Sequence, residues 1–228
     1  MIIDVYQGLL DYFSSIPDIL FGISQYEAEG SASEYQSVLS IAIPHSRRIG
    51  IADYREEKFE TLTREARQRS IDVIREIASI LEQSGVRYLI PVPAQRNEED
   101  LEAMLSFKQQ AVSAGLGWIG KNDVLITGKY GPQVTLNAIL IDTALPVGEP
   151  VYESKCPPEC ELCVEACPHS ALADTLWNNS VKRSEIIDYQ LCNRKRSAYK
   201  LLHGRKHACG LCIAACPVGR EGMFEKIK

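Results

Sequence analysis

The chain has 228 residues, of which 45% are hydrophobic and 24% charged, with 25 lysines and arginines against 30 aspartates and glutamates. This balance is typical of globular proteins and excludes disordered and fibrous classes. No apolar run approaches the roughly 18 to 20 residues of a membrane span, and Met1-Ile2-Ile3-Asp4 lacks the basic start of a secretory signal, so we expect a cytoplasmic protein with no membrane partner.

The predicted elements of the first two thirds of the chain alternate between helices and strands. Residues 1–15 and 59–84 have the apolar spacing of helices, and Gly85 is placed to end the second one. A third helix is expected to begin at Asn97 and to end at Gly115. Four apolar runs have the length of strands, the last two flanking a turn: 38–43, 86–92, 124–127 and 134–141. Such alternation predicts an α/β or α+β domain.

Cysteine content and charge divide the chain near residue 150. All eight cysteines follow that point. Residues 1–150 carry 13 basic and 21 acidic side chains (net −8), whereas residues 151–228 carry 12 and 9 (net +3). The turn-forming segment 146–150 lies at the change. We therefore expect two domains, 1–150 and 151–228.

A glycine-rich loop follows the third expected helix. Residues 115–120 satisfy G-x-G-x-x-G, and Lys121-Asn122 nearly completes a phosphate loop. Nucleotide loops of both kinds run from a strand into a helix, whereas this loop runs from a helix into a strand, which argues against a nucleotide. Two interpretations remain open: backbone that lies close to something flat or large, or a helix cap and tight turn with Trp118 in the core.

The cysteines form two runs typical of iron–sulfur proteins. The runs are Cys156-x3-Cys160-x2-Cys163-x3-Cys167-Pro168 and Cys209-x2-Cys212-x3-Cys216-Pro217, and Cys192 completes the count of eight. In the bacterial ferredoxin run the last cysteine ligates the other cluster. This crossover predicts two [4Fe-4S] clusters, with Cys156, Cys160, Cys163 and Cys216 as ligands of cluster 1 and Cys167, Cys192, Cys209 and Cys212 as ligands of cluster 2.

The cysteine spacing leaves alternatives open. Three residues separate Cys156 from Cys160 where the usual run has two, so the loop bulges outward, Cys156 binds weakly, or a remote ligand completes cluster 1. Structural zinc also uses C-x2-C pairs, and disulfides suit an oxidising compartment that the N-terminus does not indicate. The C-x3-C-P endings favour clusters over both alternatives.

A basic stretch lies between Cys192 and Cys209. It contains six lysines and arginines and no acidic residue: Arg194, Lys195, Arg196, Lys200, Arg205 and Lys206. Three roles are open for it: a solvated face that offsets a charge of about −2 on each cluster, a docking patch for an acidic redox partner or phosphate-bearing cofactor, and an RNA contact.

The glycine loop and the cysteine runs together resemble one family. The similarity is to the epoxyqueuosine reductases, and it rests on Ala114-Gly115-Leu116-Gly117-Trp118-Ile119-Gly120-Lys121-Asn122, Leu125-Ile126, Tyr130-Gly131-Pro132 and Ile139-Leu140-Ile141-Asp142. The two cysteine runs with Cys192 continue the match in the same order, so that it covers residues 85–220. The wider resemblance includes the reductive dehalogenases.

The resemblance implies an α+β protein whose two domains hold different cofactors. A nitroreductase-like α/β domain, 1–150, would bind cobalamin, and a bacterial-ferredoxin-like module, 151–228, would carry the two clusters. Cluster 2 would lie nearer the corrin, and cluster 1 would take electrons from a ferredoxin- or flavodoxin-type donor. The implied activity is the reduction of a small molecule or modified nucleoside. The cofactor would lie against five residues of the glycine loop: Gly117, Trp118, Gly120, Lys121 and Asn122.

The chain also departs from the family pattern. No residue of 93–100 matches the family's acidic proton donor cleanly, and Asp100 is the nearest candidate by spacing. The C-terminal helical repeats of full-length members are absent and the N-terminal part is short, which makes tRNA a doubtful partner. Two other functions therefore stay open: a non-catalytic two-cluster protein that serves or reactivates a partner enzyme, and a zinc-stabilised binding protein.

Overall fold

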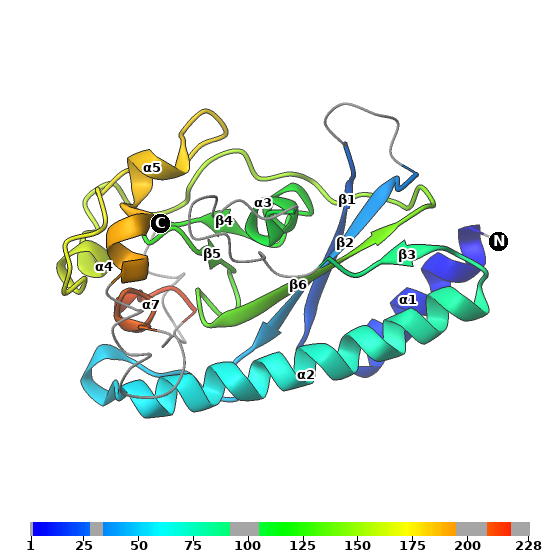
Figure 1. Cartoon of the computed structure of the whole chain (residues 1–228), viewed down its shortest axis with the longest axis horizontal. Coiled ribbons are helices and arrows are strands. Elements are labelled where there is room, and N and C mark those ends of the chain that lie inside the picture. The colour runs from blue at the N-terminus through cyan, green and yellow to red at the C-terminus, as the bar shows by residue number, and fades with distance from the viewer. Residues whose placement is uncertain (1, 28–33, 92–104, 195–208, 220–228) are drawn as a thin grey trace. The chain divides into compact units, whose positions relative to one another are not determined.

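The computed structural model describes residues 2–27, 34–91, 105–194 and 209–219 (Figure 1). The elements are α1 (Ile2–Ser15), β1 (Leu20–Gln25), β2 (Ser37–Pro44), the 3-10 helix η1 (Ile51–Asp53), α2 (Glu56–Gln83), β3 (Tyr88–Leu89), α3 (Phe107–Ser113), β4 (Trp118–Ile119), β5 (Leu125–Ile126), β6 (Val134–Ile141), α4 (Leu162–Glu165), α5 (Arg183–Ile186) and α7 (Leu211–Ala215). This order confirms the expected mixture of helices and strands. Within the described ranges, no helix combines the length and the apolar character needed to cross a bilayer.

Two compact units make up the chain, and both are discontinuous in sequence. Unit 1 contains Met1–Ile43, Arg67–Leu116 and Thr135–Val151. Unit 2 contains Pro44–Ala66, Gly117–Val134 and Tyr152–Lys228. One boundary, after Val151, lies beside the division expected near residue 150, and the other boundaries put residues 117–134 into the same unit as the cysteines. The functional assignment of 1–150 and 151–228 stays a prediction.

A four-stranded sheet forms the centre of unit 1, with the strand order β1-β2-β6-β3. β1 and β2 are antiparallel, with Leu20 opposite Ala42 and Gln25 opposite Ser37, and β3 is antiparallel to β6. All eight residues of β2 are buried. Residues 38–43 are apolar except for the buried Ser40 and do not alternate with exposed polar residues, which is typical of a strand that is covered on both faces.

The helices α1 and α2 pack against each other in unit 1 (Figure 1). A Cβ on Gly8 of α1 would lie 3.2 Å from the Ile80 side chain of α2, so the glycine permits the close approach. Val5, Leu9 and Phe13 are buried and recur at one-turn spacing along α1. The helices predicted over residues 1–15 and 59–84 are confirmed, with the second beginning earlier, at Glu56.

The observed strands differ from the predicted ones in two respects. β1 has no counterpart among the predicted elements, because Gly22 and Ser24 interrupt its apolar run. The runs 124–127 and 134–141 do flank a turn, but they do not pair with each other: β5 pairs with β4 in a separate two-stranded sheet, and β6 belongs to the larger one. Of the third predicted helix, α3 is observed from Phe107, and residues 97–104 lie outside the described residues.

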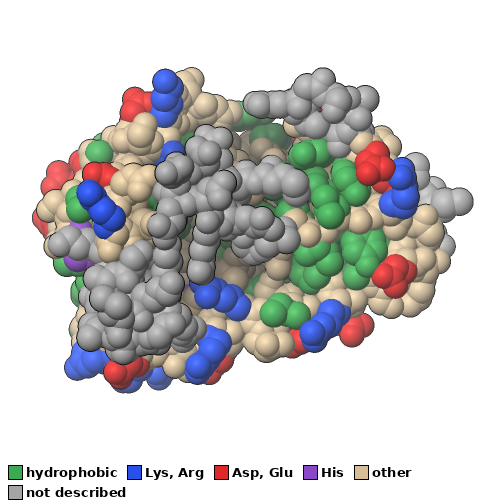
Figure 2. All heavy atoms as spheres, in the orientation of Figure 1, with side chains coloured by type: hydrophobic (Ala, Val, Ile, Leu, Met, Phe, Trp, Pro, Cys, Tyr) green, Lys and Arg blue, Asp and Glu red, His purple; other side chains and the backbone are tan. Residues whose placement is uncertain are grey.

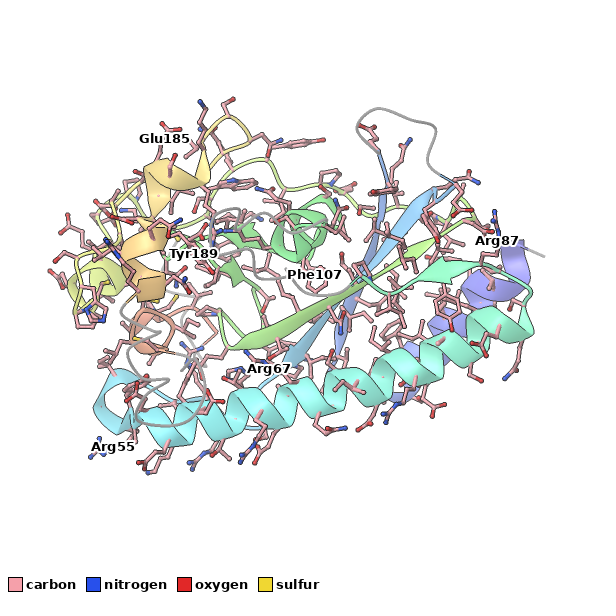
Figure 3. The ribbon with its side chains drawn as sticks, in the orientation of Figure 1. Arg55, Arg67, Arg87, Phe107, Glu185 and Tyr189 are labelled. Atoms are coloured by element: carbon pink, nitrogen blue, oxygen red, sulfur yellow. The ribbon has the colours of Figure 1, made fainter. Side chains whose placement is uncertain are left out.

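Apolar side chains gather over the four-stranded sheet of unit 1 in the view of Figure 2. A buried cluster lies there with partly buried aromatic rings packed against it: Val38, Leu105, Ala138 and Leu140, with Tyr26, Tyr35 and Phe107. The edge of the same sheet is charged. Arg87, labelled in Figure 3, donates to Asp142 at 2.9 Å and to Glu34 at 2.6 Å, and its side chain is 68% exposed.

Candidate functional site

Four cysteines from two distant runs line one cavity in unit 2. Cys156, Cys160 and Cys163 come from the loop before α4 and from α4 itself, and Cys216 directly follows α7. The cavity has a volume of about 180 Å³, and its other lining residues include Lys121 of the glycine loop. These four cysteines, called set 1 below, are the residues predicted to ligate cluster 1, and Cys156 lies with the other three despite the extra residue in its loop.

The thiols of set 1 influence one another. The pKa of Cys163 is raised to about 12, mainly by burial and then by Cys216, Cys156 and Cys160. The pKa of Cys216 is raised to about 11, again mainly by burial, although the Val218 backbone and the Arg48 guanidinium act in the opposite direction. Without a metal the thiols of Cys163 and Cys216 are therefore protonated at neutral pH, and metal binding must release their protons.

The remaining cysteines surround Cys212. Burial is the main cause that raises the pKa of Cys212, and the thiols that add to it are those of Cys209, Cys163, Cys192 and Cys167. Cys167, Cys192 and Cys212 also pack around one buried cluster that includes Leu172 and Ile187. The structure thus brings the isolated Cys192 to the two runs. Cys167, Cys192, Cys209 and Cys212 are called set 2 below.

All eight cysteines are described and all have free thiols, so the disulfide alternative has no support in the structure. Within the described residues, no three His, Cys, Asp or Glu side chains converge closely enough to hold a single metal ion. The four cysteines of set 1 line one cavity, and Cys163 lies near Cys212 together with the other members of set 2. The division into two ligand sets and the ligation of clusters stay predictions.

The turn Gly120–Asp123 contacts three parts of the cysteine-containing segment. The Lys121 ammonium group donates to the Pro158 carbonyl oxygen at 2.7 Å and pairs with Asp174 at 2.6 Å. The Asn122 amide donates to the carbonyl oxygen of Cys212 at 3.3 Å. Both side chains were predicted to contact a corrin, whereas their observed contacts are with the segment that carries the cysteines.

Asp123 extends this set of contacts to α5. Its carboxylate is buried and accepts a 2.9 Å hydrogen bond from Arg183 Nε. The Arg183 guanidinium in turn lies 3.8 Å from the centroid of the Tyr189 ring. Asp123 has a left-handed backbone, with φ at 59°, which aspartate tolerates better than most residues. The turn is therefore fixed by its own conformation and by its partners.

Close intramolecular packing explains the glycines of this loop. A Cβ on Gly117 would lie 2.1 Å from the Ile126 carbonyl oxygen, and a Cβ on Gly120 would lie 2.3 Å from Ile126 Cδ1. Gly115 follows α3 with φ at 77°, as in a helix cap, and Trp118 is buried. The cap and tight turn are confirmed. Contact between this loop and a corrin stays a prediction.

Arg48 holds the end of the last cysteine run. Its guanidinium donates to the Val218 carbonyl oxygen at 2.6 Å and also to the carbonyl oxygen of Cys216. The two partners in the first bond are 170 residues apart in sequence. No spacing pattern links Arg48 to the cysteines, so sequence reasoning did not identify it.

Tyr54 and Phe59 hold the start of the same run. The Gly210 backbone N–H donates to the Tyr54 hydroxyl at 3.0 Å, and a Cβ on Gly210 would lie 2.3 Å from a ring atom of Phe59. Burial is the main cause that raises the pKa of Tyr54. A neutral phenol and an aromatic ring therefore lie beside the Cys209–Cys212 segment.

Two of the predicted features cannot be placed. Asp100, the candidate proton donor, lies outside the described residues, as does most of the basic stretch. Arg194, which is described, is exposed. The proton donor and the three roles considered for the basic stretch stay predictions.

Curated proteins that are similar to this chain are epoxyqueuosine reductases. The one from Synechococcus sp. (strain RCC307) is 36% identical over 115 residues, which are 50% of this chain and 35% of that protein. The one from Listeria monocytogenes serovar 1/2a (strain ATCC BAA-679 / EGD-e) is 29% identical over 197 residues, which are 84% of this chain and 50% of that protein. The chain is epoxyqueuosine reductase-like. It spans 35% of the first relative's length and half of the second's, and no protein-family model matches it.

Solved structures share the fold of this epoxyqueuosine reductase-like chain. A selenomethionine-labelled epoxyqueuosine reductase has a TM-score of 0.59 at 18% identity, over 95% of this chain and 67% of that one. An epoxyqueuosine reductase with an epoxyqueuosine-modified tRNA-Tyr stem loop has a TM-score of 0.58 at 19% identity, over 95% and 66%. A catabolic reductive dehalogenase in complex with 3-bromo-4-hydroxybenzoic acid has a TM-score of 0.61 at 17% identity, over 90% and 30%. At these identities the likeness establishes the fold.

Proposed function

We propose that this chain is an oxidoreductase that passes electrons through two [4Fe-4S] clusters to a bound corrinoid for reductive chemistry. The observation that carries the proposal is the grouping of eight free thiols, from three separate stretches of sequence, around two centres. A two-cluster ferredoxin has four thiolate ligands at each cluster, and the last cysteine of each run ligates the cluster of the other run. The proposed ligand sets have this arrangement.

The proposed ligands of cluster 1 are the four cysteines of set 1, and those of cluster 2 are the four of set 2. The cavity among set 1 supports Cys156 as the fourth ligand of cluster 1 in preference to a remote residue, because Cys156 lines it with Cys160 and Cys163. The extra residue of the first loop is accordingly interpreted as a bulge.

A corrinoid, when bound, supplies the bond-breaking chemistry, and the chain supplies position and electrons. One solved dehalogenase with this fold, at a TM-score of 0.59, is described as acting by B12-dependent dehalogenation. In this chain the buried Trp118 Nε1 has no hydrogen-bond partner within the described residues, and a buried donor of this kind fits a bound cofactor that offers an acceptor. The loop Gly117–Asn122 is the proposed contact, with Asp100 proposed as proton donor.

The proposed substrate is a modified nucleoside or a small molecule of comparable size. Because a relative of the same fold is solved with a modified tRNA stem loop, a nucleoside within tRNA belongs to the proposed substrate class, which revises the expectation that tRNA is a doubtful partner. The proposed donor is a ferredoxin or flavodoxin. A reducing compartment such as the cytoplasm keeps the thiols available for clusters.

Metal analysis and cobalamin titration of anaerobically purified protein test the proposal. We expect about eight irons per chain, as two [4Fe-4S] clusters require, together with stoichiometric uptake of cobalamin. Zinc in place of iron would overturn both the clusters and the electron pathway.

A specific observation favours a second candidate, a two-cluster electron-transfer protein that serves a partner enzyme. Lys121 and Asn122, two of the residues predicted to hold the cofactor, make their described contacts with the cysteine-containing segment. Full iron content without cobalamin uptake would select this candidate.

The assignment of Cys192 has its own test. Cys192→Ala is expected to remove about half of the iron, because cluster 2 loses a ligand while cluster 1 keeps all four. Gln190→Ala, an exposed position two residues away, is the matched control and should keep full iron. Full iron in Cys192→Ala would contradict the ligand set of cluster 2.

A further inference from the structure

Lys121 is a buried lysine among the residues that line the cavity of set 1. The Lys121 side chain is 2% exposed, and the residue lines the cavity together with the four cysteines. It is held from two sides, by the Pro158 carbonyl oxygen at 2.7 Å and by the Asp174 carboxylate at 2.6 Å. Burying a lysine is costly unless its charge is matched, so this placement requires a reason beyond packing.

Both partners of Lys121 are themselves unusual. Pro158 belongs to the three-residue segment between Cys156 and Cys160, which is one residue longer than in the usual run. The Cys160 N–H donates to the Pro157 carbonyl oxygen at 3.1 Å, so the segment forms a tight turn that presents the next carbonyl to Lys121. Asp174 has φ at 57°, a left-handed conformation that is uncommon for a residue with a side chain. Lys121 therefore fastens two locally irregular segments next to set 1.

We propose that Lys121 is a positioning and charge-compensating residue of cluster 1, which fixes the Cys156–Cys160 loop and makes cluster 1 easier to reduce. This inference rests on the proposed function, because cluster 1 is part of it. It gives the Lys121 ammonium group a role at cluster 1, in addition to the proposed contact of the loop Gly117–Asn122 with the corrin.

The direction of the effect follows from the charges. A [4Fe-4S] core with four thiolates carries about −2 when oxidised and gains a further negative charge on reduction, so a nearby cation favours the reduced state. The Asp174 carboxylate opposes this effect, but Lys121 is among the residues that line the cavity of set 1 and Asp174 is not. The cation is therefore expected to have the larger effect on the cluster.

A second cation contacts the backbone of set 1, because the Arg48 guanidinium donates to the carbonyl oxygen of Cys216. Two hydrogen bonds described near set 2, from the Gly210 N–H to the Tyr54 hydroxyl and from the Asn122 amide to the Cys212 carbonyl oxygen, involve uncharged groups. Lys121 and Arg48 are both expected to raise the reduction potential of cluster 1.

Redox titration of the full anaerobically purified chain, followed by electron paramagnetic resonance, tests the inference. Two one-electron steps are expected. Lys121→Met should move one midpoint to more negative potential by about 59 mV or more, which is a tenfold change in the reduction equilibrium constant. Asp174→Asn should move the same midpoint in the positive direction, Lys121→Arg should keep it near the wild-type value, and the other midpoint should not change.

Opposite signs for Lys121→Met and Asp174→Asn separate a charge effect from a structural one, because loosening of the loop would affect both variants alike. Full iron with unchanged midpoints, or shifts of the same sign, would overturn the inference and leave the proposed function intact. If Lys121→Met loses iron, the two other variants test the inference. A positive shift of one midpoint in Asp174→Asn with an unchanged midpoint in Lys121→Arg would support it, and an unchanged or negative midpoint in Asp174→Asn would overturn it. Wild-type protein that takes up no iron would instead overturn the proposed function.

Discussion

The two compact units of this chain are stabilised in different ways. Unit 1 is built on a sheet whose strand β2 is buried along all eight residues. In unit 2 the described helices α4, α5 and α7 have four, four and five residues, and the described buried side chains include those of Glu60, Lys121 and Asp123. Unit 1 thus has a buried sheet at its centre, whereas unit 2 combines the burial of side chains such as Phe59, Trp118 and Ile186 with polar contacts between irregular segments and with whatever its cysteines bind.

This contrast has a physical basis. Helices of four or five residues are too short to be stable by themselves, because nucleation costs more than so few hydrogen bonds return. Metal binding can supply the missing folding free energy. We therefore expect the two units to respond to different perturbations, with metal removal having the largest effect and the loss of a surface ion pair the smallest.

Removal of iron by a chelator under anaerobic conditions is expected to unfold unit 2 and to leave the sheet of unit 1 intact. Structural metals contribute on the order of 10 kcal/mol to folding. In hydrogen exchange, amides of α4 and α7 should lose protection while those of β2 keep it. Retained protection in α4 and α7 would show that unit 2 folds without clusters and would remove the contrast.

Leu39→Ala is expected to act on unit 1 alone. Leu39 is fully buried in β2, so its truncation leaves a cavity and should lower the free energy of unfolding by about 2 to 5 kcal/mol. Urea denaturation measures the loss, and iron content should not change. Ile71→Ala in α2, where the side chain is 44% exposed, is the control and should change stability by no more than about 0.5 kcal/mol. Loss of iron in Leu39→Ala would mean that the units are not separately stabilised.

Gly210→Ala is expected to act on unit 2. The added Cβ would lie 2.3 to 2.5 Å from three ring atoms of Phe59, and overpacking of this kind costs about 1 to 3 kcal/mol. The residue lies between two cysteines of set 2, so part of the iron should be lost with it. Gly128→Ala is the matched control, because nothing lies within 4 Å of its Cβ position. Equal iron content in the two variants would refute the steric argument, and Phe59→Leu should rescue Gly210→Ala.

Arg87→Gln is expected to have the smallest effect. The ion pairs of Arg87 with Glu34 and Asp142 lie at the surface, where solvent and salt weaken them. The urea midpoint should match that of wild type at physiological salt. A clear decrease would show that charge contacts matter in unit 1 as well as in unit 2.

Much of unit 1 could be predicted from the sequence because its elements repeat a pattern. The apolar spacing of residues 59–84 and the run of β2, in which Ser40 is the one polar residue between Val38 and Ile43, are local properties, and both elements are observed. β1 could not be predicted, because Gly22 and Ser24 remove the pattern and its position depends on pairing with β2. Prediction therefore succeeded where the information is local.

The same distinction applies to the candidate site. The cysteine runs are local patterns, and the four cysteines predicted for cluster 1 line one cavity, whereas the division into two ligand sets stays a prediction. The corrin contact of Lys121 is implied by the family resemblance and stays a prediction, whereas its contact with Pro158, 37 residues away, follows from no spacing rule. Arg48 and Tyr54 were not identified for the same reason. The residues that hold the site together are therefore the ones that only the folded structure can identify.

The contact between Arg48 and Val218 also determines when unit 2 can finish folding during translation. The two residues are separated by 170 positions, so at about 5 to 20 residues per second a ribosome needs roughly 10 to 30 s to supply the second after the first. Unit 1 can fold once Val151 has left the ribosome. Residues 44–66 and 117–134 belong to unit 2 and can pack against the last cysteine run only after that run has been synthesised. During that interval the nascent chain carries a finished sheet and an unassembled set of thiols.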